Sequence, residues 1–275
     1  MTGRTIVITG ASDGAGAAAT RKLAAAGENV VVVGRSPAKT KAFAADMDAD
    51  YFIADFSELS QVRRLADELR DRFPRIDVLA NNAGGMINTG VPTVDGHENV
   101  LQVNYLAPFL LTTFLLDRLI KSRAKVISTS SAYQPLIRKV TAEDLLQTQR
   151  VGGPKAYALS KIAIIMFIRE LNRRYNAEGL TCASFHPGWV VSNFAPSSSS
   201  RAVAIFQATG IGRIIGTTPE QACDQLVWLA TTVGDRDWTS GEYYVKRRIG
   251  KNHKITNDPE AARELWDRTA ALVAG

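Results

Sequence analysis

Short runs of β-branched and other apolar residues alternate with longer segments of helical periodicity along the chain. The short runs are continuously apolar, which is typical of strands buried on both faces of a parallel sheet. We expect seven strands, near 5–9, 29–33, 51–54, 77–80, 125–129, 180–185 and 243–245. An Ala-rich helix ending near Ala26 is expected after the first strand, and further helices near 37–46, 58–72, 95–121, 154–178 and 219–231.

This alternation predicts an α/β fold with a doubly wound, mostly parallel sheet and helices on both faces. Asp258-Pro259 opens a last helix, and its inner face is expected to carry Leu265, Trp266, Thr269 and Leu272. No repeat or charged linker divides the 275 residues, so we expect a single domain over 1–275. The segment 193–218, Ser-rich and then apolar, is expected to form a substrate lid.

Composition and cysteine content remove several classes of protein. With 45% hydrophobic and 22% charged residues, the chain has too much apolar content to be disordered. The apolar run 105–116 is interrupted by a proline and two threonines, so we expect no stable membrane insertion. The first ten residues lead directly into a strand without a signal sequence, which predicts a cytoplasmic protein. Cys182 and Cys223 are expected to be buried reduced thiols, and no metal site is expected.

The net charge of +6 is concentrated in one stretch. Five basic residues and no acid lie between Lys246 and Lys254, and no aromatic platform accompanies them. We therefore expect a local solvated or substrate-facing patch and no nucleic-acid partner. A basic protein that binds anionic surfaces through this stretch remains an alternative.

A glycine-rich segment follows the first strand. The sequence Gly10-Ala-Ser-Asp-Gly-Ala-Gly16 leads into the first helix. Such glycines let the backbone turn tightly and approach a pyrophosphate at the helix N-terminus. A tight strand-to-helix turn explains a glycine cluster equally well, but its place after the first strand of an alternating chain favours dinucleotide binding.

Tyr157 and Lys161 are four residues apart, so they share one face of the expected helix. A tyrosine whose pKa is about 10 is a poor acid–base group at neutral pH. A nearby ammonium group favours the phenolate and lowers that pKa. Taken alone, the pair is more often an ordinary helix surface.

Several motifs together resemble the short-chain dehydrogenase/reductase family. They are the TGxxxGxG spacing from Thr9, Asn81-Asn-Ala-Gly84, Asn104, Ser131, Tyr157 with Lys161, and Pro187-Gly188, in the family's order and across most of the chain. The stretches 94–98, 102–104 and 186–188 are similar to the retinol-dehydrogenase-like branch. The resemblance implies a Rossmann-type fold.

The resemblance also implies roles for individual residues. Tyr157 would exchange a proton with the substrate oxygen, and Lys161 would bind the nicotinamide ribose and tune Tyr157. Ser131, rather than its neighbour Ser130, would hold the substrate oxygen. Asn104 would support a water that links Lys161 to solvent. The implied cofactor-binding residues are Gly10, Ser12, Asp13, Gly14, Ala15, Gly16, Arg35, Asp55, Phe56, Asn82, Ala83, Gly84, Tyr157, Lys161, Pro187, Gly188, Val190 and Ser192.

The end of the second strand bears on the choice of cofactor. An acidic residue there would bind the ribose 2′-hydroxyl of NAD, whereas Arg35 can pair with a 2′-phosphate. We therefore expect NADP(H) to be preferred over NAD(H), with Ser36 and Lys39 as helpers. Asp13 counts against this preference, because some NADP-preferring relatives carry a base there. A surface role for Arg35 is the alternative.

Together these features predict an NADP(H)-dependent oxidoreductase that interconverts a carbonyl and an alcohol on an apolar small molecule. Loops at the carboxyl ends of the strands offer an apolar pocket, for which the candidates are Met86, Ile87, Tyr133, Trp189, Phe194 and Phe206. A non-catalytic dinucleotide-binding regulator on the same scaffold is the alternative function. A homo-oligomer, dimer or tetramer, is left open.

Overall fold

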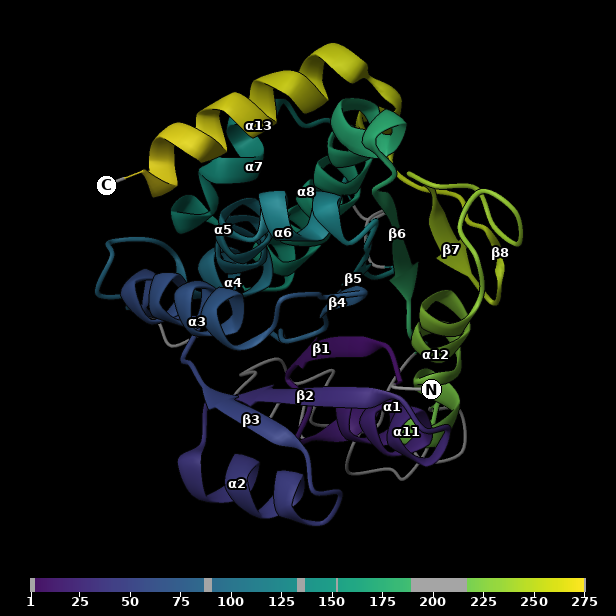
Figure 1. The fold of residues 1–275 in the computed structure, drawn as a ribbon. Coiled ribbons are helices and arrows are strands. Elements are labelled where there is room, and N and C mark those ends of the chain that lie inside the picture. The colour runs from purple at the N-terminus through teal and green to yellow at the C-terminus, as the bar shows by residue number, and fades with distance from the viewer. Residues whose placement is uncertain (1–2, 87–90, 133–136, 152, 189–216, 275) are drawn as a thin grey trace.

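The computed structural model describes residues 3–86, 91–132, 137–151, 153–188 and 217–274. Its centre is one eight-stranded sheet in the order β3-β2-β1-β4-β5-β6-β7-β8 (Figure 1). Strands β1 to β7 pair in parallel, and β8 pairs antiparallel to β7. The strands are β1 Thr5–Thr9, β2 Asn29–Gly34, β3 Asp50–Ile53, β4 Val78–Asn81, β5 Lys125–Thr129, β6 Thr181–His186, β7 Tyr243–Val245 and β8 Arg248–Ile249.

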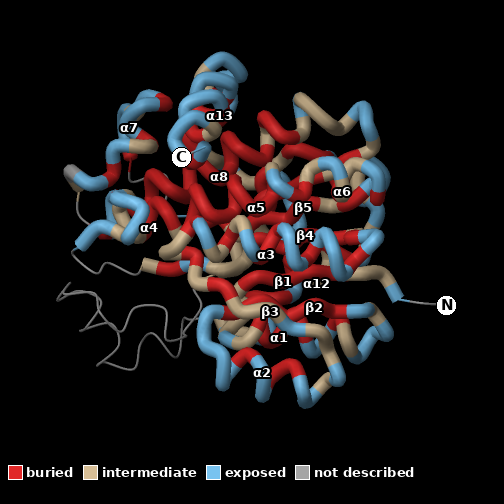
Figure 2. Tube along the Cα trace, turned by 60° about the vertical axis from the view of Figure 1, so that its left-hand side comes forward, coloured by how far each residue is buried: buried red, intermediate tan, exposed pale blue. Residues whose placement is uncertain are grey.

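Helices cover both faces of the sheet, as the alternation along the chain predicts. One face packs against α3 (Leu59–Arg72), α5 (Ala107–Phe114) and α8 (Gly153–Tyr175), and the other against α1 (Gly14–Ala25), α2 (Pro37–Ala45) and α12 (Asp224–Thr231). Because successive strand residues point to opposite faces, Val7 contributes to the first core and Ile6 and Ile8 to the second. Figure 2 shows the resulting buried centre.

Shorter helical elements complete the chain. They are α4 (Asn99–Leu101), a π-helical turn (Gln102–Leu106), α6 (Leu116–Lys121), α7 (Ala142–Leu146), α11 (Pro219–Ala222) and 3₁₀ turns at Thr148–Arg150, Asn176–Glu178 and Lys254–Asn257. The single helix expected over 95–121 is thus divided into four pieces. Pro108 gives one reason, because it has no N–H to donate to the carbonyl of Asn104 four residues earlier.

The last helix, α13 (Pro259–Val273), lies outside α8 and seals the first core (Figure 1). The Asp258 carboxylate caps it, accepting from the N–H groups of Glu260 and Ala261. Trp266 stacks on Phe167 with ring centroids 5.7 Å apart. Leu265, Trp266 and Thr269 are buried as expected, but Leu272 is 39% exposed and Val273 is buried in its place, so the prediction for Leu272 was wrong.

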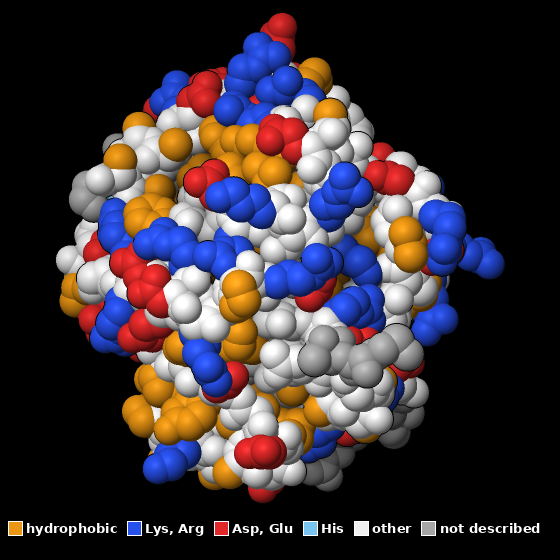
Figure 3. Space-filling view, viewed as in Figure 1, with side chains coloured by type: hydrophobic (Ala, Val, Ile, Leu, Met, Phe, Trp, Pro, Cys, Tyr) orange, Lys and Arg blue, Asp and Glu red, His pale blue; other side chains and the backbone are white. Residues whose placement is uncertain are grey.

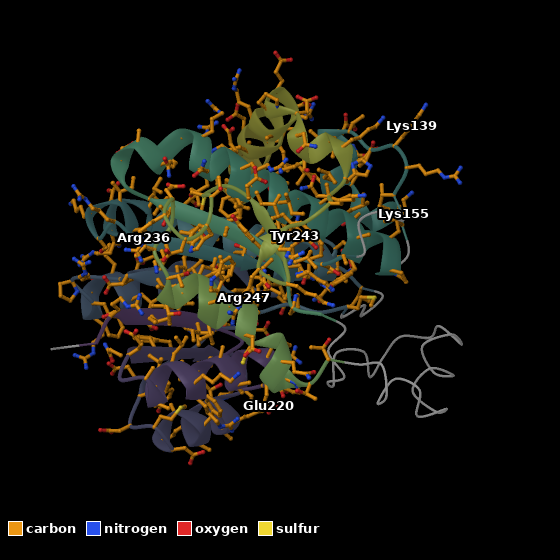
Figure 4. All side chains as sticks on the ribbon, turned by 90° about the vertical axis from the view of Figure 1, so that its right-hand side faces the viewer. Lys139, Lys155, Glu220, Arg236, Tyr243 and Arg247 are labelled. Atoms are coloured by element: carbon orange, nitrogen blue, oxygen red, sulfur yellow. The ribbon has the colours of Figure 1, made fainter. Side chains whose placement is uncertain are left out.

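The eighth strand was not expected, and it lies in the basic stretch. Lys246 and Arg247 form the two-residue turn between β7 and β8, both with positive φ. Figure 3 shows Lys and Arg side chains gathered over this hairpin. Figure 4 places Arg247 beside α12, where its N–H donates to Gln225 Oε1 (2.8 Å). The five basic residues are exposed, which agrees with a local solvated patch.

Two further expectations concern cysteines and membranes. Cys182 and Cys223 are both buried and unpaired, as predicted. Within the described ranges, no helix combines the length and the apolar character that crossing a bilayer requires. The expected lid over 193–218 lies outside the described residues except for 217 and 218.

Candidate active site

The glycine-rich loop between β1 and α1 folds closely onto the end of β4. Gly10 has φ +65°, and a Cβ there would lie 2.9 Å from Ala83 Cα. A Cβ on Gly16 would overlap the Gly10 carbonyl oxygen. Asp13 caps α1 by accepting from the N–H of Gly14 at 2.8 Å. The loop therefore needs these glycines because backbone fills the space of their missing side chains.

Thr9, a residue that the sequence reasoning did not select, ties this loop to the segment after β4. Its hydroxyl oxygen accepts from the N–H groups of Asn82 and Ala83, at 3.0 Å each. The Asn82 amide donates back to the Thr9 carbonyl at 3.0 Å and accepts from the hydroxyl of Thr129 at 3.3 Å. The ends of β1, β4 and β5 are thus locked together at the carboxyl edge of the sheet, where α/β proteins bind ligands.

The end of β2 presents an exposed cation. Arg35 is exposed and makes no hydrogen bond or ion pair within the described part of the chain. Ser36 occupies the N-cap position of α2 without a side-chain capping bond. The absence of a side chain on Gly34 leaves room for Thr40, whose buried hydroxyl has no partner in the described ranges. This corner therefore retains donors for an anionic ligand.

The carboxylate of Asp13, next to this corner, is neutralised by an ion pair. Lys39 Nζ lies 2.6 Å from Asp13 Oδ2. The hydrogen bond from Lys39 holds the pKa of Asp13 below its ordinary value of 3.8. Asp13, whose negative charge disfavours a 2′-phosphate nearby, is thus paired with the positive charge of Lys39.

After β3, Asp55 binds its own loop. Its Oδ1 accepts from the N–H and the hydroxyl of Ser57, at 2.9 and 2.7 Å. The side chain of Phe56 is buried in the core, and its carbonyl accepts from Gln102 at 3.3 Å. Of this predicted pair, Asp55 is half-buried, while Phe56 can offer a cofactor only its backbone.

Tyr157 and Lys161 lie together near the start of α8, as their spacing predicts. Lys161 Nζ is 5.4 Å from the centroid of the Tyr157 ring and donates to the carbonyl of Thr129 at 2.9 Å. Lys161 is only 3% exposed, and burial lowers its pKa to about 7. Tyr157 contacts Val100 and Ala156, with Met86 packed against the same cluster. The phenol thus lies in apolar surroundings beside a buried amine.

The two adjacent serines after β5 have different surroundings. Ser130 donates its hydroxyl to the carbonyl of Lys161 at 2.8 Å, so α8 occupies it. Ser131 is buried as well, at 6% exposure. If the chain continues the strand direction, the side chains of Ser130 and Ser131 point to opposite sides. The contact between Ser131 and a substrate oxygen stays a prediction.

Asn104 lies in the π-helical turn and is held from three sides. Its Nδ2 donates to the carbonyls of Gly85 and Val100, at 2.8 Å each, and its Oδ1 accepts from the N–H of Gly85 at 3.0 Å. A Cβ on Gly84, whose φ is +157°, would overlap Asn104 Oδ1 and lie 3.5 Å from Lys161 Nζ. The amide protons of Asn104 therefore bind protein, and its expected role in supporting a water stays a prediction.

The segment after β6 closes the described part of the site. Pro187 and Gly188 follow His186, and Gly188 has φ +96° with its Cα packed against Thr217. Val190 and Ser192 lie outside the described residues. So do five of the six pocket candidates, namely Ile87, Tyr133, Trp189, Phe194 and Phe206; only Met86 is described, beside Tyr157.

The sequence and the fold of this chain are similar to those of known proteins. The family model described as short chain dehydrogenase matches residues 4–202. A protein assigned as the daunorubicin C-13 ketoreductase DnrU of Streptomyces sp. (strain C5) is 39% identical over 99% of this chain and 93% of its own length. Human retinol dehydrogenase 13 is 31% identical over 98% of this chain and 85% of its own. The solved structure of a protein from Mycobacterium paratuberculosis is similar to this chain with a TM-score of 0.75. The two sequences are 29% identical, and the match covers 98% of this chain and 93% of the other chain.

Proposed function

The chain belongs to the short-chain dehydrogenase family and is a retinol-dehydrogenase-like oxidoreductase, and we propose that it interconverts a carbonyl and an alcohol on an apolar small molecule with NADP(H). The observation that carries the proposal is the position of Lys161 Nζ, 5.4 Å from the ring of Tyr157 in an apolar, buried setting. Because its relatives are named as oxidoreductases, the non-catalytic regulator is no longer preferred.

The residues at the carboxyl edge of the sheet fit a dinucleotide. Gly10 and Gly16 allow the loop to fold tightly against neighbouring backbone, and α1 begins in this loop, with its N-terminus at the carboxyl edge of the sheet. Arg35, free of partners in the described chain, together with the uncapped N-terminus of α2, suits a 2′-phosphate. When bound, the nicotinamide cofactor supplies or accepts the hydride.

Tyr157 would move the proton that accompanies the reaction. In the reducing direction its hydroxyl donates to the substrate oxygen, and in the oxidising direction the phenolate accepts that proton. The buried amine of Lys161, with its pKa lowered to about 7, can gain or lose a proton near neutral pH and so match the charge of the phenol. Ser131 would donate a hydrogen bond to the same substrate oxygen and fix its distance from Tyr157.

The apolar cluster around Tyr157 favours an apolar substrate. Val100 and Ala156 form an apolar cluster with the Tyr157 side chain, and Met86 packs against this cluster. Retinal and daunorubicin are the first compounds to try, because relatives are named for reactions of retinol and of daunorubicin.

The test is turnover of NADPH with a panel of aldehydes and ketones that includes these two compounds. Tyr157→Phe should lower kcat by about 100-fold or more, because it keeps the ring and deletes the proton. Its affinity for NADPH, measured by fluorescence titration, should stay near wild type.

Tyr175→Phe is the matched control, since Tyr175 lies at the far end of the same helix against Trp266. It should retain full turnover. A Tyr157→Phe enzyme with more than half of the wild-type kcat, or an absence of turnover with every carbonyl tested, would contradict the proposal.

A further inference from the structure

The parallel ladder between β5 and β6 stops beside the serine that the proposed function uses. Thr129 pairs with Phe185, and the N–H of Ser130 donates to the Phe185 carbonyl at 2.7 Å. The next bond of a parallel ladder would run from Pro187 N to the Ser130 carbonyl, but proline has no N–H. The backbone ladder therefore ends one residue before Ser131.

A side chain continues the pairing where the backbone ladder ends. The N–H of Ala132 donates to His186 Nδ1 at 3.3 Å. Ser131 thus lies between two anchored N–H groups, that of Ser130 on the Phe185 carbonyl and that of Ala132 on the His186 ring. These two bonds limit rotation of the backbone at Ser131 and hence the direction of its side chain.

The imidazole is in the form that this bond requires. A ring nitrogen accepts a hydrogen bond only when it is unprotonated, so the neutral ring carries its hydrogen on Nε2. Burial lowers the pKa of His186 to about 4, so the ring stays neutral at physiological pH. The sequence suggested only a structural residue before the Pro187-Gly188 turn.

We propose that His186 is a positioning residue: its Nδ1 holds the N–H of Ala132 and thereby keeps the Ser131 hydroxyl directed at the substrate oxygen. The inference rests on the proposed function, because it assigns Ser131 the role of substrate contact. His186 lies at the end of β6 and leads directly into the Pro187-Gly188 turn. The imidazole of His186 therefore connects the backbone after Ser131 to the Pro187-Gly188 turn.

Two variants of equal size isolate the acceptor. His186→Asn and His186→Leu both remove the ring, but only the Asn side chain carries an oxygen at the place of Nδ1. We expect His186→Leu to lower kcat by about 10- to 100-fold. His186→Asn should stay within about threefold of wild type, and both should bind NADPH with unchanged affinity. Equal activity of the two variants would overturn the proposal.

A second comparison separates positioning from general stability. In a Ser131→Ala background no hydroxyl remains to be directed, so His186→Leu and His186→Asn should have the same kcat. If His186→Leu lowers kcat by the same factor with and without the Ser131 hydroxyl, His186 does not act through Ser131. Failure of the proposed function itself would appear elsewhere, as full activity of Tyr157→Phe.

A measurement on the wild-type protein covers the case in which His186→Leu does not fold. In ¹⁵N-histidine NMR spectra, with His186 assigned by its absence from His186→Asn, we expect the Nε2–H form at pH 7, with Nδ1 at the shift of a hydrogen-bond acceptor. An Nδ1–H form or a doubly protonated ring at that pH would contradict the proposal.

Discussion

Asn104 and Gly85 form a closed pair of hydrogen bonds, in which the side-chain amide donates to the Gly85 carbonyl at 2.8 Å and accepts from the Gly85 N–H at 3.0 Å. The pair fastens the loop after β4 to the π-helical turn. Gly84, the residue before Gly85, lies beside Lys161, because a Cβ there would be 3.5 Å from Lys161 Nζ. The hydrogen bonds between Asn104 and Gly85 therefore also hold the backbone next to the Lys161 amine.

Asn104→Asp tests this pair with almost no change of shape. The carboxylate keeps an acceptor for the Gly85 N–H but faces the carbonyls of Gly85 and Val100 without a proton. We expect the free energy of unfolding to fall by about 3 kcal/mol, because the substitution buries a carboxylate that faces two carbonyl oxygens. Urea denaturation measures it. Asn29→Asp, on an exposed residue, is the control, and an equal loss in both variants would contradict the role of Asn104.

Arg35→Ala tests the choice of cofactor. Only NADPH carries the 2′-phosphate, and a charge-assisted bond contributes about 1.5–3 kcal/mol. We expect Kd for NADPH to rise by about 10- to 150-fold and Kd for NADH to stay unchanged. Lys41→Ala removes an exposed positive charge from the helix that follows Arg35, α2, and should affect both cofactors little. Equal weakening of both by Arg35→Ala, or a wild-type preference for NADH, would refute the assignment.

Lys161→Met should make the protein more stable at neutral pH while it abolishes activity. The Lys161 pKa is about 7 in the folded chain against its ordinary 10.5. Between these pH values the unfolded chain binds more protons, so the stability of the wild type rises with pH. The Met variant avoids the cost of burying the charge, and its advantage at pH 6.5, up to about 5 kcal/mol, should shrink towards pH 10.

Thermal unfolding at pH 6.5 and pH 10 compares this variant with the wild type. Lys155→Met, on the exposed lysine near the start of α8 (Figure 4), should change stability by less than about 0.5 kcal/mol at both pH values. An advantage of Lys161→Met that grows with pH would contradict the reasoning.

Asp95 caps a helix to which it does not belong. Its Oδ2 accepts from the N–H of Leu59, the first residue of α3, at 2.9 Å and from the amide of Gln102 at 2.7 Å. Glu58 occupies the N-cap position of α3 without a side-chain capping bond. We expect Asp95→Ala to lower the free energy of unfolding by about 1–2 kcal/mol and Glu58→Ala to leave it nearly unchanged. Chemical denaturation measures both, and the reverse order would disprove this cap.

The sheet could be predicted because its strands are continuously apolar and its helices fall between them. β8 could not, since two exposed residues, Arg248 and Ile249, carry no periodic signal and pair only because Lys246 and Arg247 adopt a turn that non-glycine residues seldom form. The π-helical turn around Asn104 likewise gives no hydrophobic pattern, although Pro108 is a visible cause.

In the site, the side-chain pair that the sequence places on one helix face was found there, namely Tyr157 and Lys161. Contacts to backbone atoms were missed, because a carbonyl such as that of Thr129 has no residue-type signature. The ion pair between Asp13 and Lys39 was missed for another reason, since it joins the loop after β1 to the helix after β2 and depends on how β1 and β2 pair.

The strand order has a consequence for synthesis on the ribosome. β1 lies between β2 and β4, and Ile6, Val7 and Ile8 are completely buried there. β2 is made soon after β1, but the other edge of β1 waits for residue 78, several seconds later at ordinary rates of translation. During that interval an apolar strand edge is open to pairing with other nascent chains. Substitutions that slow the pairing of β1 with β4 should therefore reduce the yield of soluble protein more than the stability of the finished fold.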